Sequence, residues 1–208
     1  MKKFILCLAV IAALNTVALA DVVIGDWETG FDGWGNWVSS AVATPTNFTI
    51  QSDTGVTLNV SALKVVQDGW SQALAISLTY DQRVALANSN TFTIDFSCAA
   101  GTSGGRLIIE SVTLNAEGFG YTTISSGQSY FDMWDGSSAR TMTLEYTYDA
   151  SLFGDGSGEG IPGYAQIIIA INGYGGQTDF YFDNAKLVPE PATLALLGLG
   201  LTLLRKRN

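Results

Sequence analysis

Residues 91–98 read TFTIDFSC, a stretch in which polar and apolar side chains alternate one by one. Because successive side chains of a strand point to opposite faces, this alternation predicts a β-strand with one buried face and one solvated face. Comparable short stretches predict further strands at residues 22–26, 47–51, 62–67, 73–78, 106–115, 142–148, 166–172 and 180–187. One short helix is expected at residues 80–88. Glycine-rich turns separate these stretches, so the chain is expected to be all-β, a single β-sandwich or barrel.

The N-terminal end is typical of a secretory signal peptide. Two lysines precede an apolar run at residues 4–14, and the sequence VALA at residues 17–20 supplies the small side chains that a signal peptidase requires. The run is shorter than the about 20 residues that span a bilayer, so we expect cleavage after residue 20 and a mature chain that begins at Asp21. An uncleaved membrane anchor is the alternative.

The C-terminal end is organised as three consecutive parts. Pro189, Glu190 and Pro191 are followed by an apolar segment at residues 192–204 and by the basic sequence RKRN at residues 205–208. The prolines favour an extended stretch. The basic cluster is expected to stay in the cytoplasm, and the apolar segment is expected to act as a transient transmembrane helix.

This order of parts, over residues 188–208, resembles the PEP-CTERM sorting signal. The resemblance implies recognition by an exosortase, a membrane transpeptidase-like enzyme that removes the tail. It also implies a place on the surface, or in the matrix, of a Gram-negative-type cell that makes exopolysaccharide. A simple C-terminal membrane anchor is the alternative. The expected division is therefore a signal peptide at residues 1–20, a β-sandwich domain at 21–187 and a sorting signal at 188–208.

The charge of the body limits its partners. Five basic residues and all nineteen acidic residues lie in the range from Asp21 to Glu190, which gives this part a net charge of −14. Such a surface repels nucleic acid and anionic lipid, and it suits divalent cations or neutral polymers. Cys98 is the one cysteine of the body, so no internal disulfide can form, and its place in an apolar strand predicts a buried thiol.

Two segments at the ends of the body resemble jelly-roll carbohydrate-binding modules, which have a galactose-binding-like β-sandwich. The opening segment DWETGFDGW, residues 26–34, is similar to their first strand and turn, and the closing segment FYFDNAKL, residues 180–187, to their last strand. In this family the two strands lie near each other. The opening pattern also implies that Trp34 belongs to the core.

The same resemblance implies a structural calcium ion between the first and last strands, with Glu28 and Asp183 as ligands and Asp26 nearby. Calcium prefers hard oxygen ligands, which carboxylates and backbone carbonyls supply. Independently of any family, a carboxylate between Phe182 and Asn184 in an apolar strand needs a partner. The alternative is that Asp183 accepts hydrogen bonds from backbone amides at a strand end.

Aromatic residues beside glycine-rich connections are candidates for sugar binding, because flat rings stack on the apolar faces of sugars. Trp134 lies in YFDMWDG, residues 130–136, which reads as an exposed turn. We expect Trp134, with Tyr130 and Tyr121, to form an aromatic platform for a polysaccharide.

Catalysis has little support in the sequence. The chain contains no histidine, which removes the most common general base and metal ligand. The available carboxylates do not form the pattern that jelly-roll glycosidases carry on one strand. The expected activity is non-catalytic binding of an extracellular polysaccharide. A purely structural surface or matrix protein is the first alternative, and a polysaccharide-degrading enzyme the second.

Overall fold

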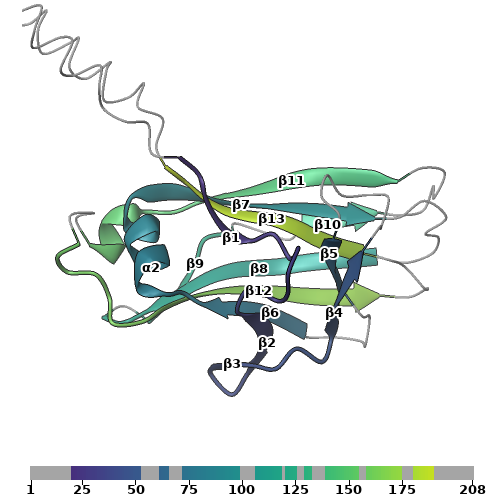
Figure 1. Ribbon diagram of the computed structural model, residues 1–208, viewed down its shortest axis with the longest axis horizontal. Helices are drawn as coiled ribbons and strands as arrows, with labels where there is room; N and C mark the ends of the chain where they lie inside the picture. The colour runs from purple at the N-terminus through teal and green to yellow at the C-terminus, as the bar shows by residue number, and fades with distance from the viewer. Residues whose placement is uncertain are drawn as a thin grey trace, which may run out of the picture.

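The computed structural model describes residues 20–52, 61–65, 72–98, 106–118, 120–125, 129–132, 139–154, 158–174 and 180–189. These residues form two antiparallel sheets that pack face to face (Figure 1). Sheet A contains, in spatial order, β11 (Arg140–Thr147), β7 (Ser89–Cys98), β13 (Phe180–Pro189), β5 (Ser61–Val65) and β4 (Phe48–Ser52), and β1 (Val22–Gly25) also pairs with β13. Sheet B contains β10 (Ser129–Asp132), β8 (Arg106–Ala116), β12 (Ala165–Tyr174), β6 (Gln72–Ser77), β2 (Trp34–Val38) and β3 (Ala41–Ala43), and β9 (Gly120–Thr123) also pairs with β8.

The core lies between the two sheets, as the alternating strands predict. The even-numbered side chains of residues 92–98 on β7 are buried in the core. On the opposite face Thr91 and Asp95 are partly exposed, whereas Thr93 and Ser97 are buried there. On the facing strand β12, Ile167, Ile169 and Ile171 are each 0% exposed. Burial of one such side chain contributes about 1.5–3 kcal/mol. The expected β-sandwich is therefore confirmed, and so is the buried thiol of Cys98.

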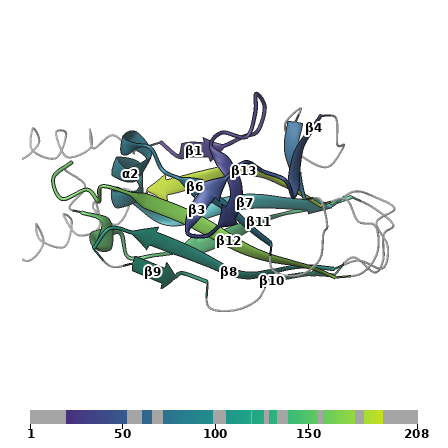
Figure 2. The same ribbon diagram turned by 90° about the horizontal axis from the view of Figure 1, so that it is seen from below.

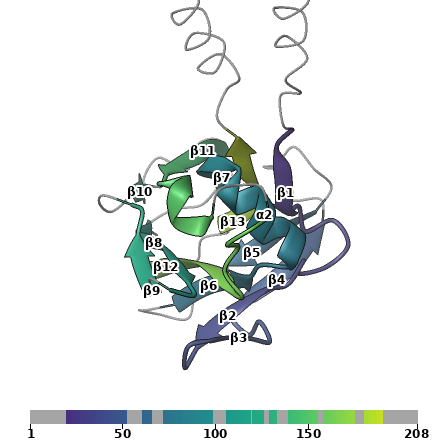
Figure 3. The ribbon, with the colours of Figure 1, turned by 90° about the vertical axis from the view of Figure 1, so that its left-hand side faces the viewer.

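Helix α2 (Tyr80–Ala87) closes one end of the sandwich together with the 3-10 helix η1 (Ala150–Phe153), as the end-on view shows (Figure 3). Thr79 begins α2 with a capping box, in which its hydroxyl accepts from the Gln82 amide and the Gln82 side chain accepts from the Thr79 amide. The predicted helix at residues 80–88 is thus confirmed. Among the described residues, no helix has the length and apolar character that a membrane crossing requires.

The first and last strands lie side by side, as the resemblance of the two ends implied. β1 runs antiparallel to β13, with Val22 opposite Leu187. The opening segment then buries two tryptophans whose ring centroids are 5.8 Å apart, Trp27 and Trp34. Trp34 is 2% exposed and its indole donates to the Ile24 carbonyl at 2.8 Å, which confirms its predicted place in the core.

Four short strands were not predicted from the sequence: β2, β3, β9 and β10. β2 and β3 extend one side of sheet B, and β9 and β10 both pair with β8 on the other side (Figure 2). These additions widen sheet B and shape the outer face on which the candidate site lies.

Candidate functional site

The outer face of sheet B carries an aromatic pair that joins its two sides. Trp37 on β2 has the opposite orientation to the core residue Trp34, and it is partly exposed. Tyr121 on β9 is 58% exposed. The ring centroids of Trp37 and Tyr121 are 6.4 Å apart and the ring planes meet at 77°, an edge-to-face contact.

This contact shows that the face is concave. Three strands, β6, β12 and β8, separate β2 from β9 in the sheet, which in a flat sheet would put the two backbones about 19 Å apart. The two side chains could then meet only if the sheet curves toward them. In the end-on view the strands from β9 to β3 follow such an arc (Figure 3).

The residues in the middle of this face are covered by other parts of the protein. Ala75 and Ile168 occupy paired positions on β6 and β12 and lie outside the core cluster between the sheets. They are nevertheless 0% and 7% exposed, so other groups cover them from outside. Gly35 lies next to them on β2, where a Cβ atom would collide with the Ala43 carbonyl of β3. The β2–β3 hairpin can therefore fold closely onto this side of the face.

A row of hydrogen-bonded polar side chains crosses the same face and begins beside Tyr121. The Asn115 side chain on β8 donates to the side-chain Oε1 of Gln166 on β12 at 2.7 Å, and Gln166 Nε2 donates to the Ser77 hydroxyl on β6 at 3.1 Å. Asn115 is also the residue that pairs with Tyr121. The row fixes the amide orientations and leaves part of their hydrogen-bonding capacity for another molecule.

A second polar pair lies toward the other end of the face. The Asn172 amide on β12 donates to the Glu110 carboxylate on β8, and Asn172 is 4% exposed. Glu110 lies where the β8–β12 register shifts, at a bulge opposite Ala170 and Ile171. Bulges redirect side chains, and here one directs a carboxylate onto the face.

The predicted aromatic platform is only partly described. Trp134 lies outside the described residues, and the structure describes the backbone of Tyr130 on β10 but not its side chain. Tyr130 pairs with Ile108 and Tyr121 with Asn115, positions roughly 23 Å apart along an extended β8. Tyr121 and Tyr130 are thus well separated, and the aromatic partner of Tyr121 is Trp37, which was not predicted from the sequence as its partner.

The residues predicted for calcium lie beside a break in strand pairing. β13 pairs with β5 through Phe182 and with β1 from Ala185, so Asp183 and Asn184 lie between two partner strands. Glu28 reaches this region, because its carboxylate accepts from the backbone amide of Ser61 at 3.2 Å, where β5 begins. The structure therefore brings the opening segment to the part of β13 that holds Asp183.

The individual carboxylates have different surroundings. Asp183 is 1% exposed, and its Oδ1 accepts from the Asn184 amide at 2.7 Å, which is the kind of backbone contact that the alternative to calcium requires. Asp26 accepts from the Glu28 amide at 3.2 Å and so closes the turn between them. Within the described ranges, no three acidic or cysteine side chains converge as metal ligands. A calcium ion here would need backbone carbonyls beside Glu28 and Asp183, which the hard-oxygen preference of calcium permits.

Two shifted pKa values belong to the end of the sandwich near η1. Burial raises the pKa of Tyr148, whose hydroxyl donates to the Leu86 carbonyl at 3.0 Å. Hydrogen bonds from the hydroxyl and backbone amide of Ser151 lower the pKa of Asp149. Both groups stabilise helix ends and lie away from the sheet B face.

Comparison with known proteins agrees with the fold and with the C-terminal signal. Residues 187–207 match the PEP-CTERM protein-sorting motif, so the chain carries the signal of an exported, cell-surface-associated protein. The structure is similar to the module CBM27-1 of Caldicellulosiruptor saccharolyticus in complex with mannohexaose, with 15% identity, a TM-score of 0.52, and coverage of 83% of this chain and 98% of that chain. It is also similar to CBM28, a carbohydrate-binding module specific for non-crystalline cellulose, with 14% identity, a TM-score of 0.52, and coverage of 81% and 95%. A search of curated protein sequences gave no match. The likeness shows the jelly-roll fold that the sequence predicted.

Proposed function

We propose that this chain is an exported surface protein whose sheet B face binds a neutral extracellular polysaccharide without catalysing a reaction. The observation that carries the proposal is the Trp37–Tyr121 pair, which spans a concave face lined with amide side chains. Aromatic rings pack against the apolar faces of sugars, and amides bind their hydroxyl groups. The combination of both on one curved face is typical of a site for a sugar chain.

The charge of the protein indicates an uncharged ligand. The body carries −14, and the face itself contains the Glu110 carboxylate. A polyanionic polysaccharide would be repelled from such a surface. The two similar modules support this choice, because one is described with mannohexaose and the other as specific for cellulose, both of which are uncharged carbohydrates.

We further infer that an exosortase removes the C-terminal tail. Pro189, the first residue of the Pro-Glu-Pro motif, ends β13, where it pairs with Ser89 of β7. The motif therefore starts directly at the edge of the folded domain. Cleavage beyond Pro189 would leave every strand of sheet A intact, because β13 extends two residues past the boundary expected between domain and sorting signal at residues 187–188.

The binding proposal is tested with a Trp37→Ala variant. Affinity electrophoresis in gels that contain neutral polysaccharides should identify a ligand for the wild-type protein. By analogy with stacking of nucleobases on aromatic side chains, loss of one ring should cost about 1–3 kcal/mol, or roughly tenfold to a hundredfold in affinity. Tyr80→Ala is the matched control, because Tyr80 is 54% exposed but lies on α2, at the end of the sandwich that α2 and η1 close. Equal binding by wild type and Trp37→Ala would refute the proposed face.

A further inference from the structure

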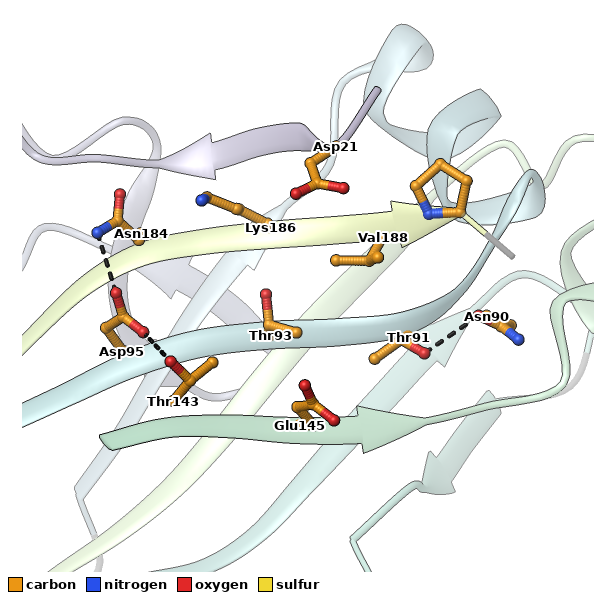
Figure 4. A pocket seen from close by; sticks show the side chains of 11 residues that line it. Asp21, Asn90, Thr91, Thr93, Asp95, Thr143, Glu145, Asn184, Lys186 and Val188 are labelled. Atoms are coloured by element: carbon orange, nitrogen blue, oxygen red, sulfur yellow. Dashed lines mark hydrogen bonds between the residues drawn. The ribbon is translucent and has the colours of Figure 1, made fainter. Parts of the chain in front are cut away.

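A second polar groove lies on the opposite side of the sandwich, on the outer face of sheet A. It has a volume of about 440 Å³, within the range of sites that hold small ligands. Strands β7, β11 and β13 supply most of its lining (Figure 4). The residues that carry the argument share the outward orientation of their strands and are Thr93, Asp95, Thr143, Glu145, Asn184 and Lys186.

The Asp95 carboxylate is held in place by both neighbouring strands. Its Oδ1 accepts from the Thr143 hydroxyl on β11 at 2.6 Å, and its Oδ2 accepts from the side-chain Nδ2 of Asn184 on β13 at 3.0 Å (Figure 4). Each carboxylate oxygen can accept a further hydrogen bond. The two hydrogen bonds therefore fix the Asp95 carboxylate in the groove as an acceptor.

The backbone at Asn184 is strained in a way that serves this arrangement. Asn184 has a φ of 52°, in the left-handed region, and it lies in the bulge between Asp183 and Lys186. Such conformations cost energy, and they persist where the surrounding structure requires them, often at binding sites. Here the bulge directs the Asn184 amide across the sheet toward Asp95, which is on β7.

A second row lies next to Asp95 and offers a different set of groups. Thr93 is paired with Glu145 on one side and with Lys186 on the other, so an acceptor, a hydroxyl and a donor follow one another across three strands. Neighbouring strands are about 4.8 Å apart, and successive outward residues about 6.7 Å. The strands β11, β7 and β13 therefore present hydrogen-bonding groups to the groove at regular spacings.

The lining indicates which class of ligand would fit. The described residues that line it include no aromatic ring, so recognition would depend on hydrogen bonds rather than on stacking. Among these described residues, the carboxylates of Asp21, Asp95 and Glu145 outnumber the ammonium group of Lys186, which disfavours anions. A neutral, hydroxyl-rich sugar chain meets both conditions.

We propose that this sheet A groove is a second glycan-binding site, so that one domain holds two polysaccharide chains on its opposite faces. The cross-linking role rests on the proposed function of the sheet B face. A bivalent protein of this kind would join chains that a single site could only coat.

The test measures binding and cross-linking separately, with the full protein and a neutral polysaccharide such as glucomannan, xylan or β-glucan. Asp95→Ala and Lys186→Ala remove groove groups, and Trp37→Ala weakens the other face. Thr147→Ala is the control, an exposed residue of β11 that does not line the groove. Melting curves first establish that each variant folds, and Lys186→Ala serves if Asp95→Ala does not.

The expected result is that wild type raises the viscosity of the polysaccharide solution and binds short oligosaccharides at two sites. Each single-face variant should bind at one site, with the other weakened at least tenfold, and should lose the viscosity increase. Thr147→Ala should behave as wild type. The sheet A groove proposal would be overturned if both groove variants still bound at two sites. It would also be overturned if wild type bound at one site and only Trp37→Ala abolished that binding. Either result would leave the sheet B proposal intact. Binding that only the groove variants abolish would instead refute the sheet B face, and no binding by wild type would refute both.

Discussion

Removal of calcium provides a direct test of the junction between the first and last strands. We predict that chelation lowers the melting temperature of the protein and that Asp183→Asn abolishes this effect. Asp183 is 1% exposed, so without a cation its negative charge would remain in a poorly solvated position. Asparagine keeps the shape of the side chain and its capacity to accept from the Asn184 backbone N–H, but it removes the charge.

The size of the effect follows from binding linkage. At free calcium 100-fold above the dissociation constant, binding adds about 2.7 kcal/mol to the free energy of unfolding. A domain of this size shifts by about 2–4 °C per kcal/mol, so EDTA should lower the melting temperature by about 5–11 °C. Asp183→Asn should melt at one temperature in either buffer.

Thermal melts followed by circular dichroism in metal-free buffer, with added calcium chloride or EDTA, provide the measurement. Magnesium chloride tests selectivity, and Asp81→Asn, a change at an exposed position on α2, is the matched control. Identical melting curves of wild type with calcium and with EDTA would refute the reasoning. If Asp183→Asn kept the full calcium effect, the ion would bind elsewhere.

Four further predictions concern other parts of the chain. Gly35→Ala should destabilise the protein by about 1–3 kcal/mol in urea unfolding, because a Cβ there collides with the Ala43 carbonyl; an unchanged midpoint would contradict the close β2–β3 packing. Because burial raises the pKa of Tyr148, the unfolded chain ionises this hydroxyl first, and the stabilising effect that is complete below pH 10 is lost as pH rises. The free energy of unfolding of wild type should therefore fall by about 1 kcal/mol more than that of Tyr148→Phe between pH 10 and 11. Parallel pH profiles of the two proteins would contradict this prediction. Trp134→Ala should weaken glycan binding at least tenfold without changing the melting temperature, whereas unfolding would place Trp134 in the core. Protein recovered from its native cell should lack residues 192–208 by intact mass, and a retained basic tail would exclude removal by an exosortase.

Much of the fold could be predicted because its long strands carry a strong alternation. TFTIDFSC places Phe92, Ile94 and Phe96 on one side, and the structure buries all three. The missed strands are short, and their sequences contain the glycine or small residues that usually mark turns. Strand β3 has three residues and β9 has four, too few for a periodic pattern to stand out.

The candidate site was harder to predict because it depends on contacts between distant parts of the chain. Tyr121 was recognised as an aromatic residue beside a turn, but its partner Trp37 is on a strand that no local pattern revealed. Asn115 and Gln166 look like ordinary solvated positions of alternating strands. Only the order of the strands shows that they cross the same face as the two rings.

The antiparallel pairing of β1 with β13 also determines how the domain resists mechanical force. Val22 and Leu187 pair at the end of the domain where both strands join their terminal segments. Force applied between these two ends would peel β1 from β13 one residue pair at a time, against few hydrogen bonds at once. Force applied between the end of β13 and a ligand on sheet B would instead shear β13 along β7, where eight residue pairs resist together. A domain held by its C-terminal end alone would therefore carry a load along its stronger direction.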